Sequence, residues 1–162
     1  MIVAALLALS LFGDKPLLEP SQTVTRHRHV GGWTVKITHD RFTGAVSCAM
    51  DKGHVEFRTD ALIFHLGRDA DTSDAVFRID GGPARNVHEA TYDDERRGFY
   101  RDGGPLANPT GGEVVLPSFY VTGAKWVWIR ATPNREPDAF DVRRFADALA
   151  LARANGCPDT GP

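Results

Sequence analysis

The pattern of hydrophobic and polar positions along the chain is that of a series of short β-strands. Trp33, Val35 and Ile37 alternate with polar neighbours, and this period of two places all three on one buried face. Residues 45–50 follow a turn and return as a second strand, with Cys48 on one of its sides. Further strands are predicted at 54–58, 61–66, 74–80, 86–91, 113–116 and 125–130.

Near the end of the chain the spacing changes from two to three and four, which predicts an amphipathic helix. Its apolar stripe is Val142, Phe145, Leu149 and Ala152. Asp141 is a typical N-cap, and Gly156 predicts a left-handed stop after the helix. The polar segment before it, with Pro133 and Pro137, is expected to be a surface connection. Many short strands followed by one helix predict an α+β fold, a mostly antiparallel β-sheet or sandwich with the C-terminal helix packed on it.

Length, composition and charge suit one globular domain. The chain has 162 residues, of which 42% are hydrophobic and 25% are charged. Its formal net charge of -2 gives no general attraction for nucleic acid or for an anionic membrane. We therefore expect neither nucleic acid nor a membrane surface as a partner.

The N-terminus has the pattern of an export signal. Residues 2–12 form an uncharged apolar run that suits a signal peptide and is too short to span a bilayer. The alternative is a buried N-terminal helix or strand. The first interpretation predicts a mature chain without a membrane span, located in the periplasm or secreted. The expected organisation is a signal peptide at 1–13, a leader at 14–31, a single β-rich domain with its helix at 32–158 and a tail at 159–162.

The leader contains a basic stretch, Arg26-His27-Arg28-His29. The two histidines alternate and are therefore able to share a metal on one face of an extended segment. No third ligand lies near them in the sequence, so we favour a solvated basic arm.

The chain contains two cysteines, Cys48 and Cys157. In an exported protein two cysteines are most simply a disulfide, which here would tie the first hairpin to the last helix. The alternative is a cysteine nucleophile, which requires a nearby histidine and a depressed pKa.

An acidic segment offers the most specific pattern for a metal. Asp69, Asp71 and Ser73 place oxygen atoms at alternate positions, and Asp80 lies at the twelfth place of a loop that partly matches a calcium-binding EF-hand. The sixth place is Asp74 where that loop needs glycine, and neither flank is helical. We favour a solvated turn, with calcium as the alternative cofactor.

Trp126 and Trp128 share one face of the 125–130 strand, and Val127 and Ile129 share the other. A strand that is apolar on both faces is usually buried between two layers, so we favour a core position for the tryptophans. If their side is open, they form with Arg130 an aromatic strip that suits a peptide or a sugar.

No residues in the chain define a catalytic site. The serines lack the flanks of a strained nucleophile turn, and phosphate-binding and dinucleotide-binding motifs are absent. Asp93, Asp94 and Glu95 are candidates for a small hydrolase that uses loop residues between Tyr92 and Thr110, and a long Gly/Pro-rich loop follows at 100–113. We predict a non-enzymatic protein, with this hydrolase as the alternative.

The order of these features resembles the invasion-associated locus B family of exported bacterial proteins. The resemblance is carried by Trp33-Thr34-Val35, by Ser47-Cys48, by the strand at 124–130 and by the closing segment 140–157. It implies a β-rich periplasmic or secreted domain that acts at the cell envelope or host interface, and it implies no catalytic residues. The expected partner is an envelope or extracellular protein or glycan.

Overall fold

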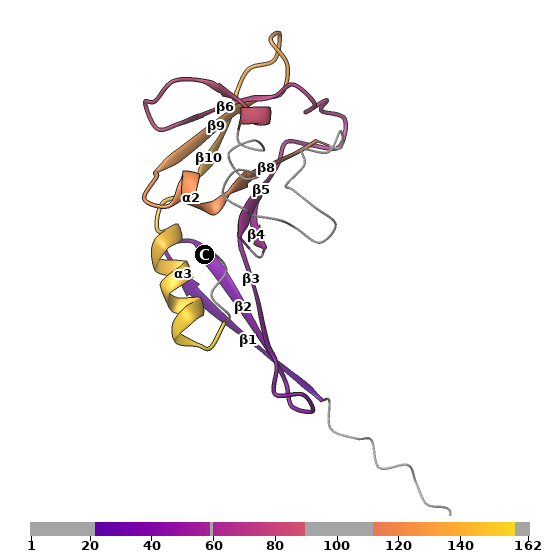
Figure 1. The fold of residues 1–162 in the computed structure, drawn as a ribbon, viewed down its shortest axis with the longest axis vertical. Coiled ribbons are helices and arrows are strands. Elements are labelled where there is room, and N and C mark those ends of the chain that lie inside the picture. Colours follow the sequence, from indigo (N-terminus) through magenta and orange to yellow (C-terminus); the bar gives the residue numbers. More distant parts are fainter. Residues whose placement is uncertain (1–21, 59, 90–111, 158–162) are drawn as a thin grey trace, which may run out of the picture.

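The computed structural model describes residues 22–58, 60–89 and 112–157, which form two antiparallel sheets and a C-terminal helix (Figure 1). Sheet A has six strands in the order β1-β2-β3-β4-β5-β8, and sheet B has four in the order β10-β9-β6-β7. The predicted fold class is therefore confirmed. The strands of sheet A are β1 (Thr23–Val30), β2 (Trp33–Asp40), β3 (Val46–Lys52), β4 (Val55–Arg58), β5 (Ala61–His65) and β8 (Glu113–Pro117). Those of sheet B are β6 (Val76–Ile79), β7 (Arg85–Asn86), β9 (Trp126–Arg130) and β10 (Asp138–Asp141).

Helix α3 (Phe145–Ala154) covers one end of sheet A, while the short helix α2 (Ser118–Val121) follows β8. The alternation in β2 gives the predicted result, because Trp33, Val35 and Ile37 are at most 1% exposed. The ring centroid of Phe145 lies 5.3 Å from that of Trp33 and 5.3 Å from that of Phe57. The buried face of β2 therefore packs against the helix.

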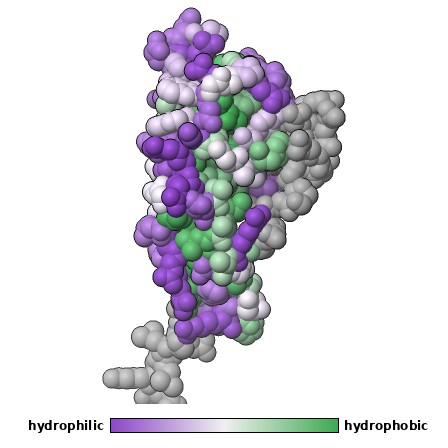
Figure 2. Space-filling view, turned by 90° about the vertical axis from the view of Figure 1, so that its left-hand side faces the viewer, coloured by the Kyte–Doolittle hydropathy of each residue, from purple (hydrophilic) through white to green (hydrophobic). Residues whose placement is uncertain are grey.

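Sheet B covers the other end of the same face of sheet A. Phe64 of β5 and Phe140 of β10 form an edge-to-face pair with centroids 5.2 Å apart. Side chains from both sheets and from α3 belong to one continuous hydrophobic core. In the view of Figure 2, hydrophobic residues gather along the middle of the surface, with hydrophilic residues mainly to their left.

The predicted disulfide between Cys48 and Cys157 is present, with Cα atoms 5.8 Å apart. Cys48 lies opposite Ile37 in the pairing of β2 with β3, on the side that faces the helix. Cys157 follows α3 directly after Gly156, which has the predicted positive φ of 83°. The bond therefore fixes the end of the helix to sheet A. It is consistent with an oxidising compartment outside the cytoplasm.

The basic segment was expected to lie in a leader before the domain, but it is part of sheet A, whose first strand already begins at Thr23. Residues 23–30 form β1, which pairs with all of β2 from Val30 opposite Trp33 to Thr23 opposite Asp40. Gly31 and Gly32 both have positive φ, and two such residues make the tight turn that joins antiparallel strands. The expected exposure is found, since Arg26, His27, Arg28 and His29 are all exposed.

The helix begins later than predicted. Asp141 is the last residue of β10, which was missed in the polar segment that the sequence indicates as a surface connection. Residue Arg144, in the left-handed conformation with φ of 67°, precedes the first helical residue Phe145. Asp141 does accept a hydrogen bond from the Arg143 N–H, at 3.0 Å, so it caps a turn before the helix. No helix in the described part of the chain is long and apolar enough to cross a membrane.

Candidate binding site

Strand β9 is buried on one side only, and this decides the position of the two tryptophans. Val127 and Ile129 are 0% exposed, whereas Trp126 and Trp128 are half-buried and Arg130 is exposed. The expected core position of both tryptophans is therefore wrong, because the core of sheet B lies on the Val127 side, where Phe77 and Phe140 also point. The outward side of sheet B, with Trp126, Trp128 and Arg130 of β9 and Arg78 of β6, is called the tryptophan face below.

The neighbouring strands complete this face. Arg78 of β6 lies directly opposite Trp128, and Val76 lies opposite Arg130. On the other side of β9, the small residue Ala139 of β10 lies opposite Trp128. Arg78 was not identified from the sequence, although its place between Phe77 and Ile79 in an alternating strand is a signal for an outward position.

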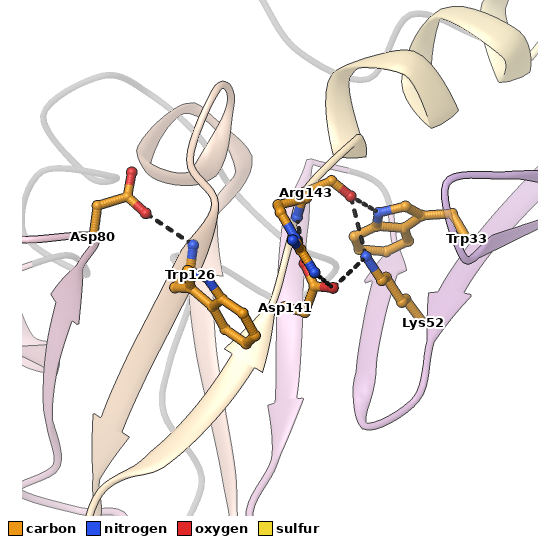
Figure 3. A network of polar contacts seen from close by, with 6 residues as sticks. All are labelled: Trp33, Lys52, Asp80, Trp126, Asp141 and Arg143. Carbon is orange, nitrogen blue, oxygen red and sulfur yellow. Dashed lines mark hydrogen bonds and ion pairs between the residues drawn. The ribbon is translucent and has the colours of Figure 1, made fainter.

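Trp126 is held by a polar network that crosses from sheet B to sheet A (Figure 3). The Arg143 guanidinium lies over the Trp126 ring, 5.2 Å from its centroid. The same guanidinium donates two hydrogen bonds of 2.9 Å to the carboxylate of Asp141, the residue opposite Trp126 in β10. The Lys52 ammonium lies 3.1 Å from the same carboxylate. One face of the Trp126 ring is therefore already occupied by a cation.

The charges in this network shift the pKa of Asp141. The Arg143 side chain, the Arg143 backbone N–H and the Lys52 ammonium together hold the pKa of that carboxyl far below its usual range, against an opposing effect of burial. The Trp33 indole N–H donates to the Arg143 carbonyl at 3.0 Å, and the Lys52 ammonium donates to it at 3.2 Å. The buried core of sheet A thus fixes the backbone that carries the Arg143 side chain.

Asp80, which the sequence offers as a ligand of the alternative calcium site, holds backbone at the start of β9. Its carboxylate accepts hydrogen bonds from the backbone N–H groups of Lys125 and Trp126, at 3.0 and 2.9 Å, and so fixes the start of β9. Asp71 accepts two hydrogen bonds from Ser73, as in the solvated turn that the sequence favours. No three His, Cys, Asp or Glu side chains in the described residues are placed to hold a metal.

A hollow of about 180 Å³ opens on the tryptophan face beside Trp128. Trp128, Arg78 and Arg130 supply its aromatic and charged surface, and Val76, Ala84 and Pro137 are among the residues that complete it. In the residues that the structure describes, neither the Arg78 nor the Arg130 guanidinium has an acidic partner or an accepting carbonyl. The hollow therefore combines an accessible indole with two cations whose charge is not neutralised by described side chains.

A second hollow, of about 540 Å³, lies between the β3–β4 turn, the end of β5 and strand β10. Its charged side chains are already paired. Lys52 pairs with Asp141, and Asp138 lies 3.4 Å from Arg135. It also contains His65, whose ring is 3.2 Å from Glu113. The charges of Lys52 and Asp141 are thus satisfied within the hollow, whereas Asp138 Oδ2 is buried and makes no hydrogen bond in the described residues, and no arginine here is without an acidic partner.

The acidic residues of the predicted hydrolase, Asp93, Asp94 and Glu95, lie outside the described residues, as do the expected signal peptide and tail. No protein family, curated protein or solved structure matches this chain. What the tryptophan face can do chemically follows from its groups: an indole packs against flat apolar surfaces, and exposed arginines form charge-assisted hydrogen bonds with carboxylates.

Proposed function

We propose that this protein is an exported bacterial domain without catalytic activity, which binds a partner at the cell envelope or host interface through its tryptophan face. One observation carries the proposal. Trp128 is half-exposed between Arg78 and Arg130, on the side of β9 that faces away from the core. Tryptophan and arginine dominate the binding energy of known interfaces, so their grouping on one open face favours recognition.

Two further features support the location. The Cys48–Cys157 disulfide suits an oxidising compartment, and the order of strands and helix resembles the invasion-associated locus B family. The export part is tested by the mass of the protein recovered from the periplasm or medium of a producing cell, without reductant. We expect a mass that is smaller by the signal peptide and by two hydrogens. A full-length mass with free thiols would contradict export.

The binding part is tested by co-sedimentation of the purified protein with bacterial envelope fragments and with host cell-surface fractions. The test variant carries Arg78→Ala, Trp128→Ala and Arg130→Ala. The matched control carries Arg26→Ala and Arg28→Ala, which remove the same charge from the exposed strand β1. We expect the test variant to bind at least tenfold more weakly than the control to one of these fractions. Equal binding by both proteins, or no binding by the wild type, would overturn the proposal.

A further inference from the structure

We propose that the hollow beside Trp128 binds a carboxylate-bearing saccharide, with the sugar ring against the indole and the carboxylate between Arg78 and Arg130. This inference rests on the proposed function, because it names the class of ligand for the same face. It is carried by the charge of the hollow, its size and the position of β9 inside sheet B.

The charge comes from two arginines that are close neighbours on one face. Arg78 lies opposite Trp128, and Arg130 lies two residues further along β9, so the two are diagonal neighbours. Such neighbours are about 7–8 Å apart in an antiparallel pair, within reach of long side chains. Like charges at this spacing repel each other, and no acidic side chain among the described residues offsets them. A bound carboxylate removes this repulsion and accepts charge-assisted hydrogen bonds from the guanidinium groups.

The size of the hollow suits one ring of a longer ligand. Its volume of about 180 Å³ is below the range of roughly 300–1,000 Å³ that is usual for a drug-sized molecule. Ala139 lies opposite Trp128 on the side away from Arg78 and is exposed, so no large side chain at that position covers the indole. The neighbouring Trp126 ring is already covered by Arg143. Trp128 is therefore the platform that is open to a ligand.

The position of β9 favours a saccharide over a peptide. Strand β9 lies between β10 and β6, so its backbone N–H and C=O groups are used by its neighbours. An extended peptide is able to bind by adding a strand to a free sheet edge, and β9, which carries Trp128 and Arg130, is not an edge strand. A sugar ring needs no backbone partner. Its C–H groups pack on the indole, and a carboxylate on the ring supplies the negative charge that neutralises Arg78 and Arg130.

The test is a calorimetric titration of the protein with tetragalacturonate, a linear saccharide that has a carboxylate on each ring. The same saccharide as its methyl ester has the same rings without the charge, and hexaglutamate has the charge without the rings. We expect tetragalacturonate to bind at least tenfold more tightly than either control compound. We also expect Trp128→Ala and the double variant Arg78→Ala/Arg130→Ala to weaken that binding at least tenfold, and Arg26→Ala/Arg28→Ala to weaken it less than twofold.

Equal binding of the methyl ester would show that the carboxylate is not recognised, and equal binding of hexaglutamate would assign the face to an acidic peptide. Equal loss in the β1 control variant would show unspecific attraction of charge. Each of these results would overturn the saccharide inference. If tetragalacturonate does not bind while the tryptophan-face variant still loses envelope or host-surface binding, the proposed function stands and only the ligand class is wrong.

Discussion

Strands β2 and β9 both begin with a tryptophan but use their tryptophans in opposite ways. In β2, Trp33 is 0% exposed and shares its buried side with Val35 and Ile37. In β9, the two tryptophans share the outward side, and Val127 and Ile129 are buried. Helix α3 covers the Trp33 side of β2, whereas the main contacts of β9 with other described elements are with its sheet neighbours β6 and β10. In β2 the polar residues of the other side already indicate which side is buried, whereas in β9, apolar on both sides, the covering element decides.

The largest loss of unfolding free energy is expected when the disulfide is removed, because this bond holds helix α3 on the buried side of β2. The bond joins residues separated by 109 positions, and the chain-entropy model gives about 4–5 kcal/mol for such a loop. We expect Cys48→Ser and Cys157→Ser to lower the free energy of unfolding by similar amounts, and the double variant to be little worse than either. Denaturant unfolding without reductant measures all three. Additive losses would show that each sulfur acts separately.

The next largest effect is expected at the buried tryptophan itself. Trp33→Ala removes a side chain that packs on Phe145 and donates to the Arg143 carbonyl, so we expect a loss of about 3–5 kcal/mol in the free energy of unfolding. Trp128→Ala is the matched variant on β9, and we expect about 1 kcal/mol or less, since its side chain already contacts solvent. Similar losses at the two positions in denaturant unfolding would mean that the Trp128 side is covered.

Two adjacent residues of β9 sharpen the comparison within one strand. Ile129 is 0% exposed and Arg130 is exposed. We expect Ile129→Ala to cost about 2–5 kcal/mol of unfolding free energy through the cavity it leaves. We expect Arg130→Ala to change that free energy by about 0.5 kcal/mol or less. Thermal unfolding of the two variants under identical conditions tests this, and a large loss for Arg130→Ala would contradict an outward position.

Local patterns were enough to predict most of the architecture. Alternation found β2, and helical spacing found the buried Phe145 and Ala152 of α3 but not Ala148, because both periods record which side of one element is buried. The cysteine count was sufficient for the disulfide. Strand β10 was missed because it is only four residues long and follows Pro137. Four residues contain too few repeats of the two-residue period for the alternation to be recognised. Strand β1 was missed because both of its faces are exposed, so no apolar alternation marks it.

The candidate site was predicted in part. Trp126, Trp128 and Arg130 were named from their shared face, but a strand that is apolar on both sides does not reveal which side is covered. Arg78 and Arg143 come from other elements and join the tryptophans only through strand pairing and through the turn before α3. Asp80 has the residue type of a metal ligand, and only its contacts with Lys125 and Trp126 show that it fixes backbone instead.

The smallest loss of unfolding free energy is expected at Asp141. Its carboxylate contacts Lys52 of sheet A and the Arg143 side chain that lies over Trp126 of sheet B. Because its pKa is lowered in the folded protein, Asp141 contributes stability that is complete above its ordinary pKa of about 3.9 and is lost as the pH falls below it. We expect Asp141→Asn to lower the free energy of unfolding at pH 7 by about 1 kcal/mol, as for a partly exposed ion pair. The difference from wild type should shrink between pH 4 and about pH 2, because the unfolded wild-type chain takes up a proton on this carboxyl while the folded protein keeps it ionised. Arg143→Ala should weaken the pH dependence of the unfolding free energy more than Lys52→Ala does, since the Arg143 side chain has the largest effect on the pKa of Asp141. Chemical denaturation over this pH range measures it, and a difference that grows toward acid pH would contradict the lowered pKa.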